Sequence, residues 1–327
     1  MTTTSWNRNK MRLFLIRHAE CQQNVGQAAA TDESNSGLTE TGKTQVQHLA
    51  RYFRDNLVQF SHIFSSDLDR ATDTAQTICK YQLGAGAARL APIQTHLLRE
   101  QQIASPGSLE GTRWKSGAPA SSTGSPDGLA GGEPGYTGEE SLGQMKARAS
   151  SFLRDFVLPL LDGPPSRGNN KEEVVAVIAH GMILQVLWIC LADFFDPGDI
   201  HFGPGVSQAD FADQVAPIWS NTGVMELDIK PGRGGVANTT TAAGAITASN
   251  TQQQRLLPLF SPGPYREPWG QGLAPPFAGW SMTILAVDST THLSTTQIGR
   301  TGGTVRNTVH GSRQGPMDEF YGITGAA

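Results

Sequence analysis

The sequence predicts an α/β fold, a three-layer α/β/α sandwich around a mainly parallel sheet. Short apolar runs alternate along the chain with segments in which apolar residues recur at helical spacing. Strands that alternate with helices form parallel sheets, because each crossover helix returns the chain to the same end of the sheet. Polar pairs such as Arg17-His18 and His180-Gly181 follow two of the apolar runs. This placement suits the fold, because ligands of such sheets bind beyond the carboxyl ends of the strands.

The first third of the chain contains three predicted strands and two predicted helices. Residues 12–16 form a short apolar run that is typical of a buried strand, and further strands are expected at 62–65 and 93–98. A second helix is expected over 68–81, where alanines permit close packing. The first helix can be capped by Thr39, and its apolar positions are Val46, Leu49, Ala50, Phe53 and Leu57.

A second group of elements begins near residue 140. Residues 141–144 match the capping-box pattern of a helix start. The apolar face of that helix would comprise Leu142, Met145, Ala149, Phe152, Leu153 and Phe156. Residues 174–179 predict a strongly apolar strand, and 182–191 predict a helix that is apolar nearly all round and therefore buried. Two further strands are expected at 224–229 and 282–287.

Two low-complexity stretches interrupt this pattern. A Gly-, Pro- and Ser-rich stretch covers about residues 105–138, and a Thr-, Ala-, Gln- and Pro-rich stretch covers about residues 231–279. We therefore expect a single domain over residues 11–293 with these two stretches as insertions. A loosely held, Gly-rich tail is expected over residues 294–327.

The composition argues against several classes of function. The net charge is -4, so neither nucleic acid nor an anionic membrane is an expected partner. The three cysteines lack the spacing of zinc ligands, and neither zinc nor a disulfide framework is expected. The apolar stretch at 174–192 is broken by His180-Gly181 and Gln185, so a strand and a helix fit it better than a membrane span. With no secretory signal pattern at the start, we expect a cytoplasmic or nuclear protein.

Polar residues near the first strand suit phosphoryl transfer. An isolated histidine is more often structural, but a neutral imidazole such as that of His18 is also a competent nucleophile toward phosphorus. Arg17 beside it would be costly to bury without an anionic partner. Arg70, in the first turn of the second helix, has two interpretations. It could pair with Asp67 or Asp73, or its guanidinium could bind phosphate oxygens through two parallel hydrogen bonds.

A second histidine and an acid complete the candidate set. His180-Gly181 ends one strand and begins a helix, where backbone N–H groups and the imidazole could bind an anion. Glu100 is expected to protonate the leaving oxygen and then to deprotonate the attacking water, with Glu110 as the competitor for this role. The sequence has no carboxylate cluster of the kind that Mg²⁺ or a two-metal site needs, so neither a metal nor another cofactor is expected.

The same residues resemble the histidine phosphatase superfamily, which includes the cofactor-dependent phosphoglycerate mutases and the fructose-2,6-bisphosphatases. Leu15-Ile-Arg-His-Ala-Glu20 is similar to the Arg-His-Gly/Ala signature of that family. Later segments resemble its other motifs in the same order, at Gly37-Leu-Thr-Glu-Thr-Gly42, Ser66-Asp-Leu-Asp-Arg70, Leu98-Arg-Glu100, Glu140-Ser141, Val177-Ile-Ala-His180-Gly181, Asn221-Thr-Gly-Val and His292-Leu293. The resemblance implies a phosphoglycerate mutase-like sheet.

The resemblance also implies roles for the site residues. His18 would be phosphorylated, and Arg17, Arg70 and His180 would form the phosphate pocket. Glu100 would be the acid/base, and Asn24 would contact phosphate or substrate.

Three departures from the family pattern are visible. Ala19 replaces the commoner glycine, and residues 103–106 are four extra residues between the acid and Gly107. The loop between Asn24 and Gly37 lacks the Trp-containing stretch of the glycolytic mutases, which favours a phosphatase over a mutase.

The leading hypothesis is therefore a metal-independent phosphomonoester hydrolase that acts through a phosphohistidine on His18. The substrate would be a small phosphorylated molecule or a phosphoprotein. A phosphoglycerate mutase-type transfer is the first alternative, because the same pocket would serve it. The second is a non-catalytic interaction module that keeps the fold and binds a partner through its insertions. The identity of the substrate and the oligomeric state are left open by the sequence.

Overall fold

The computed structural model describes residues 9–25, 37–82, 90–101, 140–161, 172–211, 217–232 and 277–294. The predicted insertion at 105–138, most of the one at 231–279 and the tail after residue 294 lie outside the described residues, as do Glu110 and the extra residues 103–106. The division into one domain, two insertions and a tail therefore stays a prediction.

Within the described residues, seven strands form one sheet in the order β3-β2-β4-β1-β6-β7-β5. Neighbouring strands run parallel from β3 to β1, β6 is antiparallel to both β1 and β7, and β5 is parallel to β7. The expected mainly parallel sheet is confirmed. The strands are β1 (Lys10–Arg17), β2 (His62–Ser66), β3 (Ile93–Thr95), β4 (Glu172–Ala179), β5 (Ile200–Phe202), β6 (Val224–Pro231) and β7 (Trp280–Ser289).

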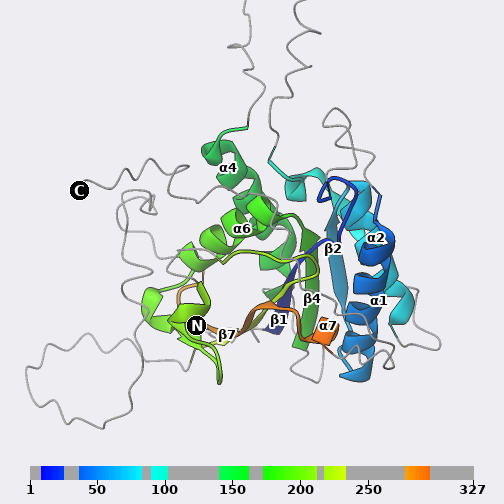
Figure 1. The fold of residues 1–327 in the computed structure, drawn as a ribbon. Helices are drawn as coiled ribbons and strands as arrows, with labels where there is room; N and C mark the ends of the chain where they lie inside the picture. Colours follow the sequence, from blue (N-terminus) through cyan, green and yellow to red (C-terminus); the bar gives the residue numbers. More distant parts are fainter. Residues whose placement is uncertain are drawn as a thin grey trace, which may run out of the picture.

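Helices cover both faces of this sheet (Figure 1). On one face lie α1 (Glu40–Asp55) and α2 (Asp69–Tyr81), and on the other lie α4 (Leu142–Phe152) and α6 (Gly181–Asp193). The predicted three-layer α/β/α sandwich is thus confirmed. The smaller elements are η2 (His96–Leu98), the π turn η4 (Leu153–Val157), α5 (Leu158–Leu161), η5 (Pro197–Asp199), η6 (Gln208–Phe211) and α7 (Thr291–Ser294).

The apolar run of β1 contributes to two separate cores. Leu13 and Leu15 belong to the cluster formed with α4 and α6, whereas Phe14 and Ile16 belong to the cluster formed with α1 and α2. Successive side chains of a strand point to opposite faces, so a strand that is covered on both faces must be apolar at every position. This requirement explains why the first strand could be recognised as a continuous apolar run.

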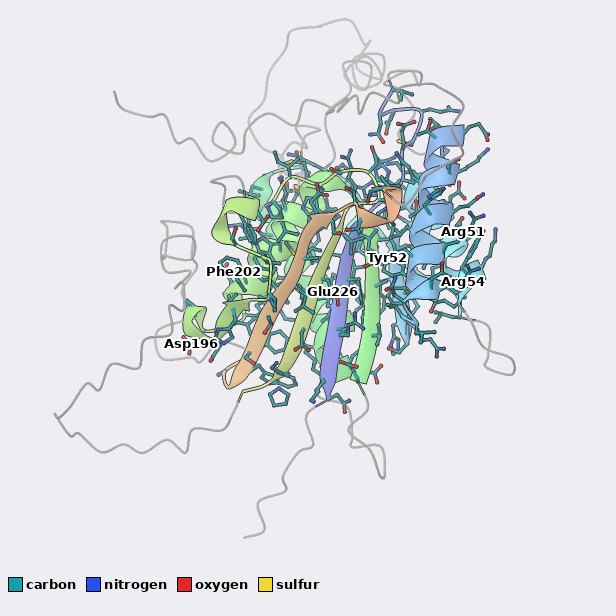
Figure 2. All side chains as sticks on the ribbon, turned by 60° about the horizontal axis from the view of Figure 1, so that its bottom comes forward. Arg51, Tyr52, Arg54, Asp196, Phe202 and Glu226 are labelled. Atoms are coloured by element: carbon teal, nitrogen blue, oxygen red, sulfur yellow. The ribbon has the colours of Figure 1, made fainter. Side chains whose placement is uncertain are left out.

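Toward β6, the face that α1 covers becomes polar. Glu226 of β6 lies in the middle of this face, and Tyr52 marks the position of α1 beside it (Figure 2). The Glu226 carboxylate accepts hydrogen bonds from Arg12 Nε at 3.1 Å and Nη2 at 2.5 Å. The Arg12 guanidinium also lies 5.2 Å from the centre of the Phe14 ring. A partly buried ion pair thus borders the apolar cluster.

The first helix ends earlier than its apolar pattern predicted. Leu57, expected on the apolar face, lies beyond α1 with φ 57° and is 77% exposed. The N–H of Leu57 donates to the Arg54 carbonyl, and the N–H of Val58 donates to the Phe53 carbonyl. These are the two hydrogen bonds of a Schellman motif, which closes a helix by turning the chain into the left-handed region.

The third strand and the helix after it also differ from the prediction. The strand expected at 93–98 ends at Thr95, because Thr95 Oγ1 accepts a hydrogen bond from Leu97 N at 3.2 Å and begins the η2 turn. The capping box at Ser141 is confirmed, but the helix changes to a π turn at Leu153. The short edge strand β5 was not predicted, since three residues are too few to show alternation.

Among the described residues, no helix combines the length and the apolar character needed to cross a membrane.

Gly42 and Gly143 both lie in the first turn of a helix, but only Gly42 has no room for a side chain. A Cβ at Gly42 would collide with the backbone carbonyl of Glu20, whereas a Cβ at Gly143 would have Ser141 Oγ as its nearest neighbour, at 3.9 Å. We expect Gly42→Ala to lower the free energy of unfolding by about 1–3 kcal/mol. Gly143→Ala should raise it by up to about 1 kcal/mol. Urea unfolding of both variants tests this contrast, and equal effects at the two positions would contradict it.

Candidate active site

The parallel pairing of β1 and β4 places two histidines side by side at the carboxyl end of the sheet. Arg17 lies opposite Ala179 in this register, and the next residue along each strand is a histidine. The backbone N–H of His18 donates to the Ala179 carbonyl at 2.9 Å. The ring centroids of His18 and His180 are 5.0 Å apart, and both side chains are buried.

The hydrogen bonds of His18 determine which ring nitrogen is free to react. Its Nδ1 lies 2.7 Å from the Ala19 carbonyl oxygen. Because a carbonyl oxygen can only accept, Nδ1 carries the proton and Nε2 keeps its lone pair. Burial, together with the positive charges of Arg17 and Arg70, holds the pKa of His18 well below 6.5. At neutral pH the ring is therefore uncharged, which is the nucleophilic form.

His180 has the opposite tautomer, because it is bound by Arg70. Arg70 lies in the first turn of α2, and its Nε donates to His180 Nδ1 at 3.1 Å. A neutral ring that accepts at Nδ1 carries its proton on Nε2. This Nε2 is buried and has no hydrogen-bond partner among the described residues. Burial, followed by the nearby His18 and Arg70, lowers the pKa of His180 well below 6.5. His180 thus offers an N–H donor beside the ring of His18.

Arg17 is oriented by the loop that precedes β6. Its Nη1 donates to the Trp219 carbonyl at 2.6 Å, and its backbone N–H donates to the Gly223 carbonyl at 3.2 Å. The side chain is only 9% exposed, and burial lowers the pKa of its guanidinium, an effect that Glu100 opposes. Asp67, which we had considered as a partner for Arg70, binds the guanidinium of Arg99 through two hydrogen bonds of 2.7 Å.

The same loop also holds the backbone of His18. Thr222 N and Asn221 Nδ2 both donate to the His18 carbonyl, at 3.3 Å and 3.1 Å. Thr222 has φ 57°, an uncommon conformation for a β-branched residue. Its Oγ1 donates to the Asn221 carbonyl at 2.7 Å and is 2.9 Å from His292 Nε2. A constrained turn thus sets the position of His18.

Asn24 joins two loops through its side-chain oxygen. Its Oδ1 accepts hydrogen bonds from the Cys21 backbone at 3.2 Å, from Cys21 Sγ at 3.3 Å and from Asn221 Nδ2 at 3.1 Å. These contacts connect the loop after β1 with the loop before β6. A contact of Asn24 with phosphate or substrate stays a prediction.

Glu100 lies at the N-terminus of α6, five residues beyond the end of β3. Its Oε2 accepts from Met182 N at 3.3 Å, and its Oε1 accepts from Ile183 N at 3.2 Å. The N–H groups of Met182 and Ile183 are thus bound by the carboxyl group of Glu100. The sequence predicts an anion-binding role for His180 and Gly181 at this helix start. The corresponding role of Gly181 stays a prediction.

Sequence reasoning missed the residues that position the site, namely Arg148, Trp219, Thr222 and Asp288. Two local signals could have found some of them. Glu140 directly precedes the N-cap Ser141, and Arg148 lies in the second turn of α4, so opposite charges at this spacing around a helix start were one signal for the ion pair. Gly223 in the Asn221-Thr-Gly motif has little room for a side chain, since a Cβ there would lie 2.9 Å from the Ser220 carbonyl oxygen and would collide with Asp288 Oδ1.

The side chains at this end of the sheet suit an anion rather than a cation. Arg17 and Arg70 provide two guanidinium groups, and His180 adds an N–H donor. Among the described residues, no group of three or more His, Cys, Asp or Glu side chains is arranged to hold a metal ion.

Comparison with known proteins identifies the family. Residues 13–201 match the model of the histidine phosphatase superfamily (branch 1). Because this match covers more than half of the chain, the protein belongs to the histidine phosphatase superfamily. The expected resemblance is confirmed.

Individual relatives carry phosphatase names. Fructose-2,6-bisphosphatase TIGAR B of Danio rerio is 29% identical over 152 residues, which are 46% of this chain and 54% of that protein. Probable phosphatase C1620.13 of Schizosaccharomyces pombe is 28% identical over 186 residues, or 57% of this chain and 58% of that protein. The chain thus spans little more than half of either relative. The solved structure of Mycobacterial hydrolase 1 aligns with 85% of this chain and 98% of its own, at 18% identity and a TM-score of 0.44.

Buried neutral histidines should make the stability of the protein depend on pH. Burial lowers the pKa of His292 to about 4, whereas an unfolded chain protonates histidine near about 6.5. The unfolded state therefore binds more protons between these values. The free energy of unfolding is highest above about pH 6.5 and falls as the pH is lowered toward 4.

We expect His292→Asn to weaken the dependence of the free energy of unfolding on pH, because one of the buried histidines is then missing. Urea unfolding at several pH values between 7 and 4 measures the effect. Ser294→Ala, in the same α7 turn, is the control and should keep the wild-type slope. A slope in His292→Asn equal to that of the wild type would refute the assignment.

Proposed function

We propose that this protein is a phosphomonoester hydrolase that transfers the phosphoryl group of its substrate to His18 and then to water. The observation that carries the proposal is the pairing of the two tautomers. The ring of His18, unprotonated at Nε2, lies 5.0 Å from the ring of His180, protonated at Nε2, and the positive charges of Arg17 and Arg70 act on both rings. A nucleophile, a hydrogen-bond donor and two fixed positive charges are the groups that phosphoryl transfer requires.

In the first step, His18 Nε2 attacks phosphorus and the bond from phosphorus to the leaving oxygen breaks. The guanidinium groups of Arg17 and Arg70 bind the phosphoryl oxygens, and His180 Nε2–H donates to them as their charge increases. Glu100 acts in its protonated form: it gives its proton to the leaving oxygen, and the alcohol departs.

In the second step, water attacks the phosphohistidine. Glu100, now a carboxylate, accepts the proton of that water, and the bond between phosphorus and His18 Nε2 breaks. Inorganic phosphate leaves, and both His18 and Glu100 return to their starting forms. Because the arginines provide the positive charge, the proposal requires no metal ion.

The covalent intermediate can be trapped directly. Rapid acid-free quenching of the enzyme mixed with ³²P-labelled phosphomonoester should leave one alkali-stable, acid-labile phosphoryl group per active site. His18→Ala should lose this label and reduce kcat by about 10⁴-fold or more, since the variant lacks the proposed nucleophile. His62→Asn is the matched control, because His62 is a partly buried histidine at the opposite end of β2. Label retained in His18→Ala would refute the assignment of the nucleophile.

Hydrolysis and mutase-type transfer can be separated by the fate of the phosphoryl group. We expect release of inorganic phosphate from p-nitrophenyl phosphate, undiminished by EDTA, and no isomerisation of 3-phosphoglycerate. Isomerisation without release of phosphate would favour the mutase. Since one relative is named a fructose-2,6-bisphosphatase, sugar bisphosphates belong in the substrate panel alongside monophosphates and a phosphopeptide. A protein that binds a partner but hydrolyses none of these would instead be a non-catalytic module.

A further inference from the structure

Arg148 of α4 makes a dense set of hydrogen bonds to the segment that carries Glu100. Its Nη1 donates to the Leu97 carbonyl at 2.9 Å and to the Arg99 carbonyl at 2.6 Å. Its Nη2 donates to the carbonyl of Glu100 itself at 3.3 Å. The Arg148 guanidinium therefore binds the backbone of the turn that connects β3 to Glu100.

Glu140 fixes the other edge of the same guanidinium. Arg148 Nε donates to Glu140 Oε1 at 2.6 Å, and Nη2 donates to Oε2 at 2.8 Å. The side chains of Arg148 and Glu140 are only 14% and 12% exposed. The backbone carbonyl of Glu140 also accepts from Gln101 Nε2 at 2.9 Å. Gln101 and Glu140, which precede and follow residues 102–139 in the sequence, are thus joined by a hydrogen bond.

We propose that Arg148, held by Glu140, is a positioning residue that aims the Glu100 carboxyl group at the leaving oxygen. The inference rests on the proposed function, because it assigns a task to the proposed acid. Among the described residues, the other hydrogen bonds to Glu100 come from the backbone N–H groups of Gln101, Met182 and Ile183, at 3.1–3.3 Å from its carboxyl oxygens.

A purely structural role for the pair makes a different prediction. If Arg148 only stabilised the fold, its loss would affect all substrates alike through the fraction of folded enzyme. If it positions the acid, the loss depends on how much the leaving group needs a proton. A nitrophenolate departs readily without one, whereas a phenolate depends more on the acid.

The test compares kcat/KM for p-nitrophenyl phosphate and phenyl phosphate, which have nearly the same size. In Arg148→Met we expect kcat/KM for phenyl phosphate to fall by about 10²-fold, the scale of a misplaced catalytic group, with a much smaller fall for p-nitrophenyl phosphate. Glu100→Gln should show the same selectivity to a greater degree. Arg148→Lys retains the charge and part of the hydrogen bonding, so it should be intermediate, and it serves if Arg148→Met folds poorly.

Arg12→Met provides the matched control, because Arg12 also binds a carboxylate through two nitrogens but lies in the first half of β1, six residues before His18. It should leave the ratio of the two substrates unchanged. The inference would be overturned if Glu100→Gln lowered kcat/KM more for phenyl phosphate than for p-nitrophenyl phosphate while neither Arg148 variant did so. The proposed function would then stay intact. Absence of selectivity in Glu100→Gln would remove Glu100 as the acid, and the positioning role would fall with it.

Discussion

The hydrogen-bonded pairing of β1 with β4 is the interaction on which the rest of the site depends. The two strands run parallel in a register that sets Arg17 opposite Ala179, and the backbone N–H of His18 continues the ladder to the Ala179 carbonyl. Both strands are apolar on both faces, so a slip of one residue would exchange the side chains that the two cores contain. The burial that stabilises the sheet therefore also keeps His18 beside His180.

Burial gives this end of the sheet its chemical character as well. The two imidazoles are buried, and the guanidinium groups of Arg17 and Arg70 lie close to them. Loss of hydration and the nearby positive charge both favour the uncharged form of each histidine. The remaining proton on each ring is then placed by a single neighbour, the Ala19 carbonyl for His18 and the Arg70 Nε for His180. The two residues are chemically identical, but their hydrogen bonds leave a lone pair on His18 Nε2 and a proton on His180 Nε2.

The groups that hold the site come from parts of the chain far from it in sequence. The family match ends at residue 201, yet Trp219 orients Arg17 and Thr222 supports the backbone of His18. Asp288, with φ 43°, accepts hydrogen bonds from both the backbone and the hydroxyl of Ser220 and thereby anchors that loop to β7. Left-handed conformations at Thr222 and Asp288 are costly and persist only where surrounding contacts compensate. The antiparallel β6–β7 pair therefore supports Arg17 and His18.

The sequence by itself determined the sandwich and several residues at its strand ends, because continuous apolar runs and helical spacing are local patterns. Arg17, His18 and His180 end or directly follow such runs, and Arg70 lies in the first turn of the helix after β2. Only the tertiary structure decided the rest. Leu57 lies outside the helix, because a closing turn ends α1 before the apolar pattern does. Glu100 contacts α6 because of a turn that no periodic pattern in the sequence predicts. The Arg148 contacts depend on carbonyl oxygens of a distant segment, and the tautomer of His180 depends on Arg70, which is 110 residues away in the sequence. Backbone carbonyls are present at every residue, so no sequence pattern can show which of them a buried side chain will meet.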